Sequence, residues 1–173
     1  MEALIKSTRR KKSYAKINLV VSNNSKAKGL EIAKKNKISS IHSFQKKIFE
    51  KKINKYLNEI DLICLAGFMQ ILSSEFVEKW RKRIINIHPS YLPLFKGLNA
   101  QNQAITADAL YSGCTVHYVS PKIDSGEIIL QKKVKIRKKD NTESLSKKIL
   151  VEEHKIYPRA LEMIAKKILK CTK

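Results

Sequence analysis

Asn86 and His88 are the pair of residues whose types and spacing point most directly to chemistry. They stand two positions apart in RIINIH, over residues 83–88, a run typical of a β-strand, so both side chains are expected on one face. An amide donor beside a titratable imidazole suits a reaction that develops negative charge on an oxygen and moves a proton. A hydrogen-bonded pair at a strand end, with no chemistry, is the alternative.

Asp124 is the expected partner of His88, from the segment SPKIDSGE between two predicted strands. A carboxylate beside an imidazole raises the imidazole pKa and keeps the ring protonated near neutrality. An aspartate in a turn before Ser-Gly is also common for conformational reasons alone. The apolar run GFMQIL, over 67–72, suits the wall of a planar ligand site, although such residues more often belong to a core.

The elements that must position these residues alternate along the chain. Hydrophobic patterning predicts strands at 16–23, 61–67, 83–88, 114–120 and 127–136, and helices at 25–36, 46–59, 73–80 and 98–109. A further helix is predicted to begin near 141, capped by Asp140 and Glu143, and to divide at Pro158. This order favours an α/β fold with a single doubly wound, mostly parallel sheet, an antiparallel hairpin at one edge and C-terminal helices. The loops 67–72, 88–97 and 120–126 would then gather at the carboxyl ends of the strands.

Composition bounds the function classes. The 173 residues, 43% of them hydrophobic, suit one globular domain, and no apolar run approaches the length of a membrane span. The net charge of +21 comes from lysines scattered along the chain, which favours background composition over a specific nucleic-acid or membrane surface. Three widely spaced cysteines predict a reducing, cytoplasmic setting. The histidine spacing disfavours a metal site, and neither a serine-hydrolase elbow nor a phosphate-binding glycine motif is present.

Four segments together resemble the phosphoribosylglycinamide formyltransferase family. They are LAGFMQIL (65–72), INIHPSYLPLFKGLNAQNQAI (85–105), GCTVHYVSPKIDSGEIILQ (113–131) and EEHKIYPRAL (152–161). The resemblance implies a Rossmann-like enzyme that transfers the formyl group of 10-formyltetrahydrofolate to the amine of glycinamide ribonucleotide, in purine biosynthesis, without a metal. A related formyltransferase or formylfolate hydrolase, and an inactive basic binding module, stay open as alternatives.

The resemblance also implies roles for individual residues. Asn86 would hold the formyl oxygen, His88 would act as the protonated acid, and Asp124 would support His88. The folate would be bound by Met69, Gln70, Ile71, Leu72, Asn86, Ser120, Pro121, Lys122, Ile123 and Asp124. The ribonucleotide would be contacted by Leu150, Val151, Glu152 and Glu153. Small-molecule substrates are the expected partners, and the oligomeric state is left open.

One departure from the family concerns the first residues. Members open with a strand and a Gly-Ser-Asn loop that cradles the substrate phosphate, whereas this chain opens with MEALIK, which resembles the helix after that loop. The resemblance therefore implies a formyltransferase domain over residues 1–173 that is incomplete at its N-terminus. The strand at 16–22 is then expected to keep one unpaired edge.

Overall fold

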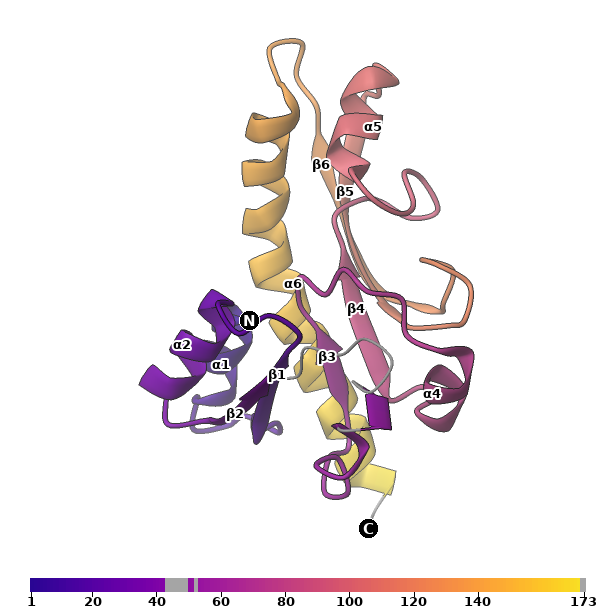
Figure 1. Cartoon of the computed structure of the whole chain (residues 1–173). Helices are drawn as coiled ribbons and strands as arrows, with labels where there is room; N and C mark the ends of the chain where they lie inside the picture. Colours follow the sequence, from indigo (N-terminus) through magenta and orange to yellow (C-terminus); the bar gives the residue numbers. More distant parts are fainter. Residues whose placement is uncertain (43–49, 52, 172–173) are drawn as a thin grey trace. The chain divides into compact units, whose positions relative to one another are not determined.

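The computed structural model describes residues 1–42, 50–51 and 53–171 (Figure 1). Its contacts divide the chain into two compact units, one formed by Met1–Asp61 with the residues from Ile164 onward, the other by Leu62–Met163. All the predicted site residues belong to the second unit. The expected single domain over 1–173 stays a prediction.

The first unit contains a two-stranded parallel sheet. Helix α1 (Glu2–Thr8) precedes β1 (Leu19–Ser22), α2 (Lys28–Lys35) and β2 (Ser39–His42), and β1 pairs with β2 from Leu19↔Ser39 to Ser22↔His42. Among the described strands, β2 is the one that pairs with β1. β2 was not predicted, because SSIH carries one apolar residue and is too short to show a strand alternation. Of the helix predicted at 46–59, residues 46–49 and 52 lie outside the described residues. Residues 50–51 and 53–54 are helical, whereas 55–59 are not, so the helical part ends earlier than predicted.

The second unit contains a four-stranded sheet in the order β3-β4-β5-β6. Its elements are β3 (Ile63–Leu65), α4 (Ser74–Lys79), β4 (Ile84–His88), α5 (Ala100–Thr106), β5 (Tyr111–Tyr118), β6 (Ile128–Lys135) and the first part of α6 (Thr142–Cys171). β3 and β4 are parallel, whereas β4–β5 and β5–β6 are antiparallel. The α/β class and the β5–β6 hairpin are confirmed. A single sheet was expected, but the described strands form two sheets. Among these strands, β1 pairs only with β2 and β3 pairs only with β4.

The sequence dictates where β5 and β6 can approach. A Cβ atom placed on Gly126 would lie 1.7 Å from the carbonyl oxygen of Tyr118, so only glycine permits the crossing just before β6. Gly113 in β5 is equally constrained, since its Cβ would lie 2.1 Å from the Lys132 carbonyl oxygen. The two glycines thereby fix the hairpin that carries the loop 120–126.

Helix α6 departs from expectation in two ways. Its first turn is capped by Asn141, whose Oδ1 accepts the backbone N–H of Ser144 at 2.9 Å, while Asp140 pairs with Lys148, so the predicted Asp140–Glu143 cap is wrong. The helix also continues through Pro158, so the predicted division is wrong. Proline removes one backbone hydrogen bond, but the buried face persists on both sides of Pro158, and its packing outweighs the loss. This face comprises Ile156, Tyr157, Ala160 and Leu161.

Candidate active site

Strand β4 carries Asn86 and His88 to the carboxyl end of the sheet. Ile84 and Ile85 anchor the strand, at 1% and 0% exposure, and β3 and β5 flank it on either side. The His88 ring is buried, and its Nδ1 lies 3.3 Å from Oδ2 of Asp124. The structure therefore brings the predicted imidazole and carboxylate together, although 36 positions separate them in sequence.

The second nitrogen of His88 meets the backbone of the following loop. Its Nε2 lies 2.9 Å from the carbonyl oxygen of Phe95, and because a carbonyl can only accept, Nε2 carries a proton. Phe95 adopts a left-handed backbone with φ of 55°, uncommon for an aromatic residue, and this conformation belongs to the loop that presents the carbonyl. Nδ1 is the nitrogen that faces Asp124.

Asp124 joins two loops. Its Oδ2 accepts the backbone N–H of Gly97 at 2.8 Å as well as facing His88, and its own φ is 44°. The neighbouring Ser125 accepts a hydrogen bond from Lys96 Nζ at 2.7 Å, a second tie between the same loops. The carboxylate is thus held by backbone on one side and by the imidazole on the other, which leaves it little freedom to rotate.

His117 is a member of this cluster that the sequence analysis did not single out. It pairs with Asn86 across β4 and β5, and its Nε2 lies 3.5 Å from the Asn86 Nδ2 and 3.6 Å from Asp124 Oδ1. Burial lowers the pKa of His117, which favours the neutral ring. Nδ1–H then donates to the Tyr118 carbonyl, so Nε2 is free to accept from Asn86. His117 lies in the strand predicted at 114–120, but no local pattern places that strand beside the one that carries Asn86.

Apart from Asn86 on β4, the predicted folate-binding residues lie on two loops of the same unit. Met69 and Ile71 are 78% and 69% exposed, and Ile123 is 52% exposed, so three large apolar side chains are open to a ligand. Gln70 and Leu72 are half-buried, Pro121 and Lys122 are exposed, and Ser120 Oγ donates to the Lys122 carbonyl at 2.9 Å. The loop 120–124 reaches the buried cluster through Asp124, and exposed apolar side chains next to a buried polar group are typical of a small-molecule site. The individual roles stay predictions.

The predicted ribonucleotide-binding residues lie on α6. Leu150 and Val151 are about half exposed, and Glu152 pairs with Lys155 at 2.7 Å. Burial raises the pKa of Glu153 to about 7. One turn later the Tyr157 hydroxyl lies 2.7 Å from the Leu65 carbonyl oxygen and 3.1 Å from that of Ile85, which packs this part of α6 against β3 and β4.

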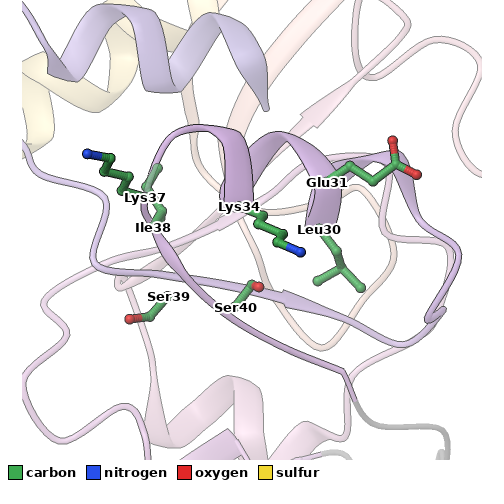
Figure 2. Close-up of a pocket in the computed structure, with 7 residues that line it drawn as sticks. All are labelled: Leu30, Glu31, Lys34, Lys37, Ile38, Ser39 and Ser40. Carbon is green, nitrogen blue, oxygen red and sulfur yellow. The ribbon is translucent and has the colours of Figure 1, made fainter.

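A pocket of about 480 Å³ lies in the first unit, between α2 and β2 (Figure 2). None of the predicted site residues lines it. Its walls are Leu30, Glu31, Lys34, Lys37, Ile38, Ser39 and Ser40. Figure 2 shows Glu31 and Lys37 directed outward at opposite ends, so the hollow is an open surface feature.

Across 1–42, 50–51 and 53–171, no three His, Cys, Asp or Glu side chains gather in a way that could hold a metal ion. Within the same residues, no helix combines the length and apolarity needed to cross a bilayer.

Comparison with known proteins places the chain. Residues 1–161 match the family described as formyl transferase. The trifunctional purine biosynthetic protein adenosine-3 of Bos taurus is 44% identical over 172 residues, which make up 95% of this chain and 17% of that protein. Phosphoribosylglycinamide formyltransferase of Bacillus subtilis is 34% identical over 171 residues, 94% of this chain and 87% of that enzyme.

A solved structure gives the same answer. The crystal structure of phosphoribosylglycinamide formyltransferase from Anaplasma phagocytophilum aligns with a TM-score of 0.91 and 45% identity, over 96% of this chain and 81% of that one. The present chain spans about a sixth of the length of the trifunctional relatives, but most of the length of the monofunctional ones. The match over residues 1–161 and the likeness to these enzymes agree, and the chain belongs to the formyl transferase family.

Proposed function

We propose that this protein transfers the formyl group of 10-formyltetrahydrofolate to the amine of glycinamide ribonucleotide, in purine biosynthesis. The observation that carries the proposal is the cluster of Asn86, His88 and Asp124, with the imidazole Nδ1 3.3 Å from the carboxylate, in a chain of the formyl transferase family. The relatives named phosphoribosylglycinamide formyltransferase support the choice of acceptor.

The proposed reaction needs proton transfer and stabilisation of an oxyanion. The glycinamide nitrogen attacks the formyl carbon and forms the new C–N bond, while the bond to the folate N10 breaks; the amine loses a proton and N10 gains one. Asn86 donates one amide hydrogen to His117, which leaves the other for the oxygen that becomes negative. His88 passes the proton from Nδ1, the nitrogen that the Phe95 contact leaves facing the site.

The two loops with exposed apolar side chains fit a folate. Met69, Ile71 and Ile123 offer flat contact to a pterin ring, and the backbone of 120–124 offers donors and acceptors for its polar edge. Gln70 and Leu72, with Ser120, Pro121 and Lys122, complete the proposed folate site. The formyl group would then point at Asn86 and His88.

The α6 segment fits the acceptor. Glu153, whose pKa burial raises to about 7, changes charge near neutrality and would contact the ribonucleotide together with Leu150, Val151 and Glu152. We place the reaction in the cytoplasm, where both small-molecule substrates would be available. No specific nucleic acid and no membrane belong to the proposal, and the lysine-rich charge of +21 has no assigned role.

Incubation of the purified protein with 10-formyltetrahydrofolate and glycinamide ribonucleotide tests the proposal. Mass spectrometry should find formylated acceptor in equal amounts to the tetrahydrofolate released, and omission of the acceptor should abolish the release. Release at the same rate without acceptor would identify a formylfolate hydrolase. A folded protein that consumes no formylfolate under either condition would contradict any transfer activity.

A further inference from the structure

The Thr115 hydroxyl is the centre of a buried network between β5, β6 and the segment that follows β4. Thr115 is fully buried, and its Oγ1 donates to the Ser90 carbonyl at 2.8 Å. The same oxygen accepts the backbone N–H of Leu92 at 3.1 Å and the side-chain amide of Gln131 at 2.9 Å. One donated and two accepted bonds use the full capacity of a hydroxyl, so its orientation is fixed.

Gln131 holds the other end of this network. Its Nε2 also donates to the Leu92 carbonyl at 2.7 Å, and because a carbonyl only accepts, the amide can present only its NH₂ group there. Both backbone groups of Leu92 are therefore hydrogen bonded, the N–H to Thr115 and the C=O to Gln131. Thr115 is on β5 and Gln131 is on the edge strand β6, which carries none of the proposed reacting groups.

The network leads to His88 by two routes. In the sheet, His88 pairs with Thr115 and Thr115 pairs with Gln131, so the three residues form one row across β4, β5 and β6. Along the chain, Leu92 belongs to the turn that Ser90 closes by donating to the Leu94 carbonyl, and the next residue is Phe95. The Phe95 carbonyl is the acceptor for His88 Nε2.

We propose that Gln131 is a positioning residue for formyl transfer: by clamping Leu92 together with Thr115, it sets the place of the Phe95 carbonyl and thereby the direction of the His88 ring. The inference rests on the proposed role of His88 as proton donor. Gln131 acts through Leu92, Thr115 and Phe95. Loss of its amide frees the turn, and small displacements of a reacting group carry large costs in rate.

Substitution of Gln131 tests the inference in the full-length protein. Gln131→Leu keeps the side-chain size and removes both hydrogen bonds, and Lys132→Gln, an exposed neighbour on β6, is the control. We expect kcat to fall roughly 10- to 100-fold while KM for the folate stays within about twofold. Thr115→Val, which removes the hydroxyl, should give a similar loss. Thr115→Ser keeps the hydroxyl and should retain most of the activity. This pair tests the network even if Gln131→Leu folds poorly.

A readout independent of turnover separates this inference from the proposed function. The ¹⁵N resonance of His88 Nε2, assigned with a His88→Asn variant, should shift, and its proton should exchange faster with water, in Gln131→Leu and Thr115→Val but not in Lys132→Gln. Unchanged resonance and exchange, or a folded Gln131→Leu with wild-type kcat, would overturn the positioning role. Wild-type protein without transfer activity would reject the proposed function, while the ¹⁵N experiment would still decide the role of Gln131.

Discussion

The loop cluster around His88 and the pocket beside α2 differ in how their polar groups are held. At the cluster, His88 contacts Asp124 and the Phe95 carbonyl, and Asp124 contacts His88, His117 and the Gly97 N–H, so backbone groups supply part of the restraint. At the pocket, no ion pair or side-chain hydrogen bond within the described residues restrains Glu31, Lys34 or Lys37. The pocket thus has no restrained polar groups, whereas the restrained polar groups lie in the cluster around His88.

The comparison gives a physical reason to place the proposed reaction at the cluster around His88. A fixed, partly buried polar group costs little reorganisation during a reaction, because its hydrogen bonds already orient it. Mobile lysines on an open surface lose rotamer freedom whenever they bind an anion. Polar groups that are held in place and lie close together are therefore the better guide to the site in this molecule. Variants in the cluster and in the pocket should show which region supports formyl transfer.

The largest contrast is expected in formyl transfer. His88→Asn or Asp124→Asn should lower the transfer rate by roughly 10²-fold or more, the range for loss of a general acid or of its partner. Lys34→Ala, in the pocket, should leave the rate unchanged. Folate binding should change far less than turnover, because apolar loop contacts provide most of it. Near-normal turnover in both site variants, or a comparable loss in Lys34→Ala, would reverse the comparison.

Two glycine substitutions extend the contrast to stability. Gly126→Ala should lower the free energy of unfolding by about 2–4 kcal/mol, because its Cβ would lie 1.7 Å from the Tyr118 carbonyl oxygen. Gly29→Ala, in α2, meets only the Met1 side chain at 3.5 Å and should stabilise by up to about 0.5 kcal/mol through helix propensity. Urea denaturation measures both. Equal effects at the two glycines would show that the β5–β6 approach is not rigid.

The pH dependence of stability should carry two opposite contributions from the second unit. Burial lowers the pKa of His117 below 6.5, so as the pH falls below 6.5 the unfolded chain gains a proton that the folded ring resists, and stability falls. Burial raises the pKa of Glu153 to about 7, so between pH 7 and 4.5 the folded carboxyl holds a proton that the unfolded one loses, and this contribution grows as the pH falls.

Variants separate these two slopes, each at most about 1.4 kcal/mol per pH unit. Glu153→Gln should remove the contribution between pH 4.5 and 7 and leave stability falling more steeply with acid. His117→Asn should make it fall less steeply below pH 6.5. Urea midpoints at half-unit intervals from pH 5 to 7.5 supply the data. Identical profiles in wild type and Glu153→Gln would show that the Glu153 carboxyl is not perturbed by burial.

The smallest effect concerns the charge of +21. If the lysines are background composition, binding to DNA or RNA should be weak, indifferent to sequence and steeply weakened by salt, since it rests on counterion release. Fluorescence anisotropy at low and at physiological salt measures this. Nanomolar, sequence-selective binding at physiological salt would favour the binding-module alternative and give the surface lysines a function.

Local patterns predicted most of the second unit, and tertiary contacts account for what they missed. The run 83–88 correctly predicts β4, because β-branched residues and a following proline are local signals of a strand and its end. His117 was not predicted as a site residue, because it joins the site only through its pairing with Asn86 across two strands. Pro158 led to the wrong prediction of two helices, because the effect of a proline on a helix depends on packing that no local pattern contains. The Phe95 carbonyl and its left-handed backbone are likewise invisible in sequence.

A double-mutant cycle on formyl transfer tests most directly the central claim, that His88 and Asp124 act as one unit. Transfer from 10-formyltetrahydrofolate to glycinamide ribonucleotide would be measured for wild type, His88→Asn, Asp124→Asn and the double variant, with folding checked for each. Because the carboxylate acts through the imidazole 3.3 Å away, the double variant should lose little more than the worse single variant. Losses that multiply would show two independent roles and would contradict the account.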